Sequence, residues 1–358
     1  YCDFNSHVRD SVDQDEWRRA LLRDLDHEAS LLPGRRLTSI FFGGGTPSLM
    51  DPATAEAVIA RAMEHWRPAS DIEITMEANP NSAEAERFAD LGTAGVNRIS
   101  LGLQSFDDSK LAFLGRAHSA REGLQALDAA QRAVERVSFD LIYALPGDTE
   151  DEWRRDLDRA LSLGTEHLSL YELTIEPGTR FATDVAKRAF EPLDADRAAA
   201  LFELTQQRTA EAGLPAYEIS NHARPGAESR HNLTYWRYRD YAGIGPGAHG
   251  RRSGRSTVRH RKPENFLSAV ARNGHGLVEE AKLSTKERAQ EALVMGLRLA
   301  EGIEVAALAK RLAAPAIVDS AAVDRLVGHG LMWRDANRVG VTEAGRLLLD
   351  SILAEIAT

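Results

Sequence analysis

The sequence predicts an α/β fold, a parallel sheet or barrel with covering helices, followed by a mainly helical, winged-helix-like C-terminal domain. Short apolar runs alternate with longer amphipathic stretches through the first two-thirds of the chain. Several of these runs are apolar throughout, which is typical of parallel strands that helices cover. The C-terminal part instead shows helical patterns, a short hairpin and a last helix, which together resemble a winged-helix module.

Expected strands and expected helices alternate along the chain. Strands are predicted at Leu37–Phe42, Asp71–Met76, Arg98–Leu103, Val137–Tyr143, His167–Leu173 and Ala216–Ser220. Helices are predicted at Asp13–Leu31, Pro52–His65, Ala83–Leu91, Arg121–Val134, Glu150–Leu163 and Asp194–Ala212. Asp51 and Pro52 form a credible helix start, and Gly213 with Pro215 forms a clear helix stop.

The strand pattern fades over residues 222–262, where Gly, Arg and His cluster. Further helices are expected at Ser284–Leu299, Val305–Leu312 and Val318–His329, then a hairpin over residues 331–341 and a last helix from Thr342. We therefore predict a barrel domain over residues 1–222, a connecting segment over 223–283 and a winged-helix-like domain over 284–358.

The composition excludes some function classes. The chain of 358 residues is 43% hydrophobic and 27% charged, with a formal net charge of −10. This charge argues against a nucleic-acid partner held by phosphate contacts. The absence of an apolar run of roughly 18 residues argues against an integral membrane protein. A single cysteine fits a reducing compartment, and we expect the cytoplasm.

That single cysteine, Cys2, lies at the edge of a chain that begins with Tyr1. We expect that the natural N-terminus is missing. A solitary thiol is by default an inert or buried residue, whereas the last cysteine of a metal motif has a defined chemistry. The rest of the sequence decides between the two.

Polar and glycine residues follow several of the predicted strands. Gly43–Pro47 ends the first strand, Glu77 and Asn79 follow the second, Gln104 follows the third, and Asp140 lies within the fourth. The carboxyl ends of parallel strands are where α/β folds and barrels place their ligands. Each residue alone would more often be a cap or a solvated loop residue, but their coincidence predicts a site.

The motifs taken together resemble those of one enzyme family. They are Cys2, Gly43–Pro47, Glu77–Pro80, Gly95–Phe106, Leu114–His118 and Asp140–Gly147. In this order they resemble the radical SAM enzymes, and within them the oxygen-independent coproporphyrinogen III oxidases and the HemW-type haem chaperones. The resemblance covers nearly the whole chain, and Gly95–Phe106 is its most specific block. It implies an incomplete parallel (β/α) barrel of the radical SAM type.

The resemblance also implies two cofactors. The family's cluster loop reads Cys-x3-Cys-x2-Cys, and Cys2 looks like its third cysteine, with the other two upstream of Tyr1. Three thiolates leave one iron of a [4Fe–4S] cluster open for S-adenosylmethionine (SAM). The family pattern implies that Gly44, Gly45 and Thr46 approach the methionine part of SAM. It likewise implies that polar groups of SAM are contacted by Glu77, Gln104, Arg116 and Asp140. An external electron donor would reduce SAM.

Two features favour the chaperone branch over the oxidase branch. The oxidases carry a further cysteine where this chain has Phe4. The chaperones carry a His-Asn-x-x-Tyr motif, which His231, Asn232 and Tyr235 match. Imidazole is a common axial haem ligand. One of eleven histidines in a polar segment is, however, usually structural.

The resemblance implies a haem chaperone that binds haem and passes it to a haem-requiring acceptor, a respiratory or membrane-associated protein. The alternative is an enzyme of porphyrin biosynthesis that decarboxylates coproporphyrinogen III through a SAM-derived radical. A third possibility is a scaffold without a cluster, which the codons upstream of Tyr1 would test.

Overall fold

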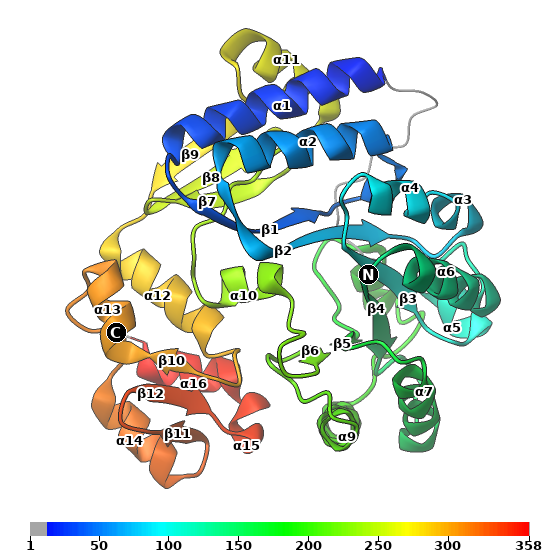
Figure 1. The fold of residues 1–358 in the computed structure, drawn as a ribbon. Helices are drawn as coiled ribbons and strands as arrows, with labels where there is room; N and C mark the ends of the chain where they lie inside the picture. Colours follow the sequence, from blue (N-terminus) through cyan, green and yellow to red (C-terminus); the bar gives the residue numbers. More distant parts are fainter. Residues whose placement is uncertain (1–12, 358) are drawn as a thin grey trace. The chain divides into compact units, whose positions relative to one another are not determined.

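The computed structural model describes residues 13–357, and Figure 1 traces their path. The chain divides into two compact units. The first runs to Ala216 and resumes over Ser220–Ser229, while the second holds Tyr217–Ile219 and everything from Arg230 onward. The three-part division at residues 222 and 283 stays a prediction.

The first unit alternates strands with helices. Its strands are β1 (Arg36–Phe42), β2 (Arg67–Ala78), β3 (Arg98–Gln104), β4 (Arg136–Tyr143), β5 (His167–Glu172) and β6 (Asn221–Ala223). Its longer helices are α1 (Gln14–Leu31), α2 (Pro52–His65), α6 (Ala120–Ala133), α7 (Glu150–Ser162) and α9 (Ala195–Glu211). Its short helices are η1 (Pro47–Leu49), α3 (Ser82–Ala85), α4 (Phe88–Thr93), α5 (Asp108–Phe113) and α8 (Arg180–Ala186).

The six strands form one sheet in the order β1-β2-β3-β4-β5-β6. Strands β1 to β5 pair in parallel, and β6 pairs antiparallel with β5. Figure 1 shows the helices lining the outer face of this curved sheet. Fully buried side chains such as Met76, Ile99 and Phe139 form the layer beneath them. The predicted incomplete parallel barrel is confirmed, because the helices cover an open sheet and the crossovers are helical.

The sixth predicted strand is wrong. Ala216 makes only an isolated bridge with His222, and the sheet strand is Asn221–Ala223. The intervening Tyr217–Ile219 belongs to the second unit, where Ile219 packs on the hydrophobic core and the Tyr217 carbonyl accepts from the Ala300 amide. An apolar run can pack as readily outside a sheet as within it, so its pattern alone misplaced the strand.

The helix predicted at Ala83–Leu91 is also interrupted. The structure has two short helices, α3 and α4, with Glu86 and Arg87 between them. The Arg87 guanidinium donates to the Met50 carbonyl at 3.0 Å, and Glu84 is turned inward to the loops at the sheet edge. These tertiary contacts outweigh the continuous helical pattern of the sequence.

The second unit combines two small sheets with helices. Its helices are α10 (Arg230–Trp236), α11 (Pro263–Asn273), α12 (Thr285–Gly296), α13 (Val305–Leu312), α14 (Ser320–Gly328), α15 (Glu343–Arg346) and α16 (Leu349–Ile356). Strands β7 (His249–Arg252), β8 (Arg255–Arg259) and β9 (Leu277–Lys282) form one sheet. Strands β10 (Ile303–Glu304), β12 (Arg338–Val341) and β11 (Met332–Arg334) form the other.

The C-terminal part of this unit has the predicted helices and hairpin, and the mainly helical C-terminal domain is confirmed. Its core includes Leu293, Ile303, Val323 and Ile356, all almost fully buried. The capping box of Ser284 and Glu287 fixes the start of α12 within one residue of the expected place. The single last helix expected from Thr342 is instead α15 followed by α16.

The segment without a visible strand pattern, residues 222–262, contains β7 and β8 as well as α10. The pattern was missed because the inward positions carry arginines. Arg251 and Arg252 are about 5% exposed and Arg259 is fully buried. Arg252 makes two 3.2 Å contacts with the carboxylate of Glu280, which compensates its burial.

Within residues 13–357, no helix combines the length and apolar character needed to cross a membrane.

Candidate functional site

The glycine run leaves β1 as a turn at the carboxyl edge of the sheet. Gly44 adopts φ of 124°, a conformation that side-chain-bearing residues rarely adopt, and a Cβ there would meet no heavy atom within 4 Å. A Cβ on Gly43 would instead lie 2.6 Å from the Phe41 ring. The backbone is therefore closely packed at Gly43 and leaves open space at Gly44, where a ligand could approach it.

Glu77 ties this turn to the end of the neighbouring strand. Its Oε2 accepts a hydrogen bond of 3.1 Å from the Gly44 amide. Burial raises the pKa of the Glu77 carboxyl, and the Gly44 amide partly offsets that rise. A partly desolvated carboxylate beside an open backbone turn is suited to a positively charged ligand group.

Asn79, two residues further on, joins two other predicted site residues. Its Oδ1 accepts from Arg116 Nη2 at 2.7 Å, and its Nδ2 lies 3.4 Å from Thr46 Oγ1. Arg116 also donates to the Gly102 carbonyl at 3.3 Å. Asn79 therefore links the turn after β1 to the guanidinium that follows α5.

The third strand ends under backbone strain. Gln104 adopts φ of 66°, in the left-handed region that glycine favours, and its side chain is almost fully buried. A Cβ on Gly102 would lie 2.8 Å from Gln104 Nε2 and 3.3 Å from Arg116 Nη2. Glycine at 102 is what lets both polar groups approach the sheet edge, and such strain is concentrated at functional sites.

Asp140 of β4 has the most perturbed carboxyl at this edge. Burial raises its pKa to about 7, and repulsion from Glu77 adds to the rise, while a hydrogen bond with Ser169 and the charges of Arg116 and Arg98 oppose it. Glu77 and Asp140 lie on β2 and β4, the two strands on either side of β3. The structure thus gathers at one sheet edge the residues predicted from sequence: Gly44, Gly45, Thr46, Glu77, Gln104, Arg116 and Asp140.

Cys2, the predicted cluster ligand, lies outside the described residues. Within residues 13–357 no group of three or more His, Cys, Asp or Glu side chains could hold a metal ion. The assignment of Cys2 to a [4Fe–4S] cluster therefore stays a prediction from sequence.

The predicted haem motif lies in the second unit, on α10. His231 and Tyr235 are one helical turn apart on the same face, with ring centroids 4.7 Å apart. Asn232 faces another way, because its Nδ2 donates to the Tyr217 hydroxyl at 3.1 Å. His231, Asn232 and Tyr235 are all partly exposed.

Tyr241, which sequence reasoning missed, and Arg251 complete this aromatic cluster. The Tyr241 ring lies 4.3 Å from the Tyr235 ring, and the Arg251 guanidinium lies 5.4 Å from the Tyr241 ring. Burial raises the pKa of both Tyr235 and Tyr241, so each phenol stays protonated at neutral pH. Tyr241 follows Asp240 in a segment without a motif, and its sequence gave no signal.

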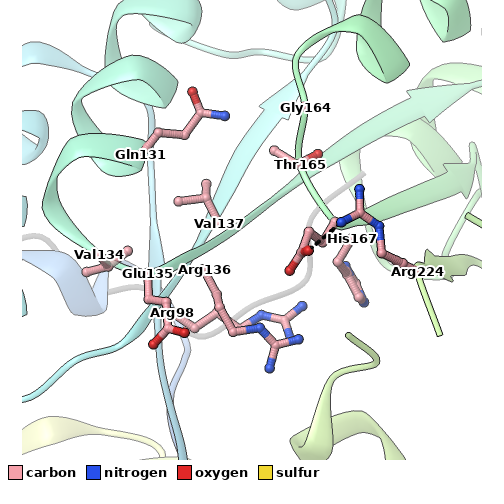
Figure 2. Close-up of a pocket in the computed structure, with 11 residues that line it drawn as sticks. Arg98, Gln131, Val134, Glu135, Arg136, Val137, Gly164, Thr165, His167 and Arg224 are labelled. Carbon is pink, nitrogen blue, oxygen red and sulfur yellow. Dashed lines mark hydrogen bonds and ion pairs between the residues drawn. The ribbon is translucent and has the colours of Figure 1, made fainter. Parts of the chain in front are cut away.

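A cavity of about 320 Å³ lies at the opposite, amino-terminal edge of the first unit's sheet (Figure 2). Arg98, Arg136 and Arg224 line it, but each has a carboxylate neighbour. Arg98 lies 2.9 Å and Arg136 lies 3.5 Å from Glu73, and Arg224 lies 2.8 Å from Glu166. Arg136 also donates to the Ala227 carbonyl at 2.7 Å. The arginines thus fasten the returning segment 220–229 to the sheet.

Three further residues at the candidate site were missed from the sequence. Ser169 and Asn221 form a 2.9 Å hydrogen bond beside Asp140, and they come from strands with no polar pattern. Glu84 accepts from the Asn79 amide at 2.7 Å. Only Glu84 had a sequence signal, since Asn81 followed by Glu84 has the spacing of a helix cap.

Comparison with known proteins agrees with this fold. Residues 1–160 match the Radical SAM superfamily, and residues 283–348 match the HemN C-terminal domain. The chain is 37% identical to the haem chaperone HemW of Escherichia coli strain K12, over 99% of this chain and 93% of that protein. It is 42% identical to the mitochondrial radical S-adenosyl methionine domain-containing protein 1 of Bos taurus, over 85% of this chain and 71% of that protein.

A solved structure extends the agreement to the fold. The coproporphyrinogen III oxidase HemN of Escherichia coli superimposes with a TM-score of 0.79 at 20% identity, covering 99% of this chain and 85% of that one. Fold and relatives together define the class of protein, a radical SAM partial barrel with a HemN-type C-terminal domain. Within that class, the chain belongs to the family of HemW and its mitochondrial relatives.

Proposed function

We propose that this protein is a haem chaperone that carries SAM and a [4Fe–4S] cluster and delivers haem to an acceptor protein. The observation that supports it most is the similarity to HemW proteins over nearly the whole chain, at 37% identity in Escherichia coli and 32% in Bacillus subtilis. Those relatives are named haem chaperones, whereas the HemN oxidase structure is only 20% identical to this chain.

SAM is the proposed ligand of the sheet-edge site. SAM carries a sulfonium and an ammonium group as well as a carboxylate. The edge offers Glu77 and Asp140, two carboxyls whose pKa values are raised chiefly by burial and which a positively charged ligand group would stabilise in the ionised form. It also offers Arg116, and guanidinium pairs well with carboxylate. The open backbone of Gly44, with Gly45 and Thr46, suits the methionine part, and Gln104 suits a hydroxyl or an amino group.

The proposed [4Fe–4S] cluster would be held by Cys2 together with the two further cysteines that the family's Cys-x3-Cys-x2-Cys pattern requires. When bound, it would supply electrons to SAM, received from an external donor. The chain's own residues would orient SAM at the sheet edge. The iron and sulfide content and the thiolate-to-iron charge-transfer absorbance of the anaerobically reconstituted full-length protein test this assignment directly. Both should be lower in the Cys2→Ala variant than in the wild-type protein.

Haem is the proposed cargo of the second unit. The imidazole of His231 is a suitable axial ligand, and Tyr235 lies beside it on the same helical face. The protonated phenols of Tyr235 and Tyr241 would act as packing and hydrogen-bonding groups, since a phenolate is disfavoured there. Asn232 would fix the start of α10 through Tyr217.

Titration of the full-length protein with haem, monitored at the Soret band, tests this assignment. We expect His231→Ala to shift the Soret band and to weaken binding. His260→Ala is a matched control, because His260 is also partly exposed and lies in the same unit, outside the motif. An unchanged Soret position and stoichiometry in His231→Ala would remove His231 as the ligand.

The activity assay separates the chaperone from an oxidase. Anaerobic incubation with reductant, SAM and coproporphyrinogen III should give no catalytic formation of protoporphyrinogen IX. Haem transfer to an apo-acceptor, one of the respiratory or membrane-associated haem proteins, should proceed. Catalytic product formation would contradict the proposed carrier function and place the protein in porphyrin biosynthesis.

The proposed compartment is the cytoplasm, because one cysteine in 358 residues suits a reducing environment. Relatives named mitochondrial, such as those of Bos taurus and Mus musculus, define the competing compartment. Fractionation of cells that express the full-length tagged protein distinguishes the two.

A further inference from the structure

Glu84 of α3 is a buried carboxylate with a full set of partners. It is 1% exposed. Its Oε2 accepts from the Asn79 amide at 2.7 Å and from the Ser48 hydroxyl, and its Oε1 accepts from Asn81 Nδ2 at 2.7 Å. Burying a charge is costly unless such hydrogen bonds compensate it, so this position needs a structural or functional reason.

The partners of Glu84 belong to two different loops of the first unit. Ser48 lies in η1, directly after the glycine turn that leaves β1. Asn79 lies in the loop that leaves β2. One carboxylate therefore connects both loops. The first loop supplies Gly44 and Thr46 to the candidate site, and the second directly follows Glu77 at the end of β2.

A second link runs from Glu84 through Asn79. The backbone of Asn79 is held by Glu84, while its side chain contacts Arg116 at 2.7 Å and Thr46 at 3.4 Å. Displacement of Asn79 would therefore move or release two of the polar groups proposed to face SAM. Glu84 itself is not among those groups.

A purely local role for Glu84 explains less. Asn81 caps α3 by accepting from the Glu84 amide at 3.0 Å, and that bond does not need the Glu84 side chain. Helix α3 is only 4 residues long, so stabilising it gains little for a buried charge. The contacts outside the helix, to Ser48 and Asn79, are the ones that require a carboxylate.

We propose that Glu84 is a positioning residue of the SAM site, which fixes the glycine turn after β1 and the Asn79 loop after β2 relative to each other. The inference rests on the proposed binding of SAM at this edge. Glu84 acts through Ser48 and Asn79 and makes no contact with SAM.

Glu84→Gln is the sharpest test because it keeps the size of the side chain. Three donors face the Glu84 carboxylate, from Asn79, Ser48 and Asn81. Glutamine has one acceptor oxygen, so its amide nitrogen, itself a donor, must face at least one of these donors and cannot accept its hydrogen bond. We expect SAM affinity to fall by about tenfold or more, the size of one lost buried charge-assisted bond.

Two control variants separate positioning from general damage. Glu86→Gln makes the same chemical change two residues away at an exposed position, and it should leave SAM affinity unchanged. Trp153→Phe removes a buried 2.7 Å hydrogen bond to Thr205, far along the chain from the loops. It should lower the unfolding temperature and leave SAM affinity unchanged.

The measurements are titration calorimetry with SAM and hydrogen exchange of residues 43–50 and 79–81, both on the anaerobically reconstituted full-length protein. We expect Glu84→Gln to speed exchange in both loops even without SAM. Should Glu84→Gln fail to fold, Ser48→Ala removes only the link to the glycine turn and should speed exchange over residues 43–50.

The possible results divide cleanly. Unchanged affinity and unchanged exchange in Glu84→Gln would overturn the positioning role. An equal loss of affinity in Trp153→Phe would overturn it too, because the effect would then follow stability. If the wild-type protein does not bind SAM, the proposed function fails. Faster loop exchange in Glu84→Gln would then still support the loop-fastening role and separate the two failures.

Discussion

Asp140→Asn is expected to make the ligand-free protein more stable at high pH and to change it little at low pH. The folded-state pKa of Asp140 is raised from 3.8 to about 7, first by burial and then by the charge of Glu77. At pH values between these two pKa values, Asp140 holds a proton in the folded protein that it has released in the unfolded chain. Stability contributed by the protonated carboxyl is therefore complete below pH about 4 and is lost as the pH rises to about 7.

The magnitude follows from the size of the pKa rise. A rise of about three units corresponds to about 4 kcal/mol of unfolding free energy between pH 4 and pH 8. Asp140 is partly exposed, so relaxation and water reduce this value, and we expect about 2 to 4 kcal/mol. Asparagine resembles the protonated carboxyl and keeps a partner for Ser169, so the variant avoids the loss.

Urea unfolding of wild-type and Asp140→Asn protein at pH 4.5, 6 and 8 measures the effect. The stability difference should grow with pH in favour of the variant. Glu77→Gln removes the second cause of the pKa rise, so in that background the growth should be smaller. A stability difference that stays constant from pH 4.5 to pH 8 would refute the reasoning.

Three further predictions concern the same unit. The affinity for SAM should rise from pH 6 to pH 8 as Asp140 ionises, and the affinity for S-adenosylhomocysteine, which lacks the sulfonium charge, should rise less. Calorimetric titrations that show the same pH dependence for both ligands would contradict the charge argument. Gly102→Ala should weaken SAM binding at least severalfold, because its Cβ would lie 2.8 Å from Gln104 Nε2. Gly328→Ala is the control, because Gly328 has open space around it and no positive φ, and it should leave SAM binding unchanged. Arg98→Met should lower the free energy of unfolding in urea by about 3 to 5 kcal/mol, because it removes the 2.9 Å ion pair and leaves the Glu73 carboxylate buried without that partner. A decrease below about 1 kcal/mol would show that Arg136 compensates for the missing charge.

The strand and helix pattern was readable where burial follows hydrophobicity. Strands β1 to β5 each have an apolar core sequence, and their expected bounds differ from the observed ones by a residue or two, apart from the longer β2. The pattern failed where burial is polar, at Arg251, Arg252 and Arg259 in β7 and β8. It also failed at Tyr217–Ile219, whose apolar side chains pack in the other unit.

The candidate site was predictable as a set of positions. Parallel strands bring their carboxyl ends to one edge, so Gly44, Glu77, Gln104 and Asp140 were expected to lie together. What the sequence lacks is the connection between them. The sequence places Glu84 in a predicted helix, and a local helix pattern does not reveal that its carboxylate turns inward to meet Ser48 and Asn79.

The sequence by itself determined the parallel α/β barrel, the helical C-terminal domain and the family resemblance, since periodicity and motifs are properties of neighbouring residues. Only the tertiary structure decided the protonation of Asp140, the strained backbone of Gln104 and the fastening of two loops by Glu84. The physical reason is that desolvation, repulsion between carboxyls and buried hydrogen bonds depend on distances between residues that are far apart along the chain.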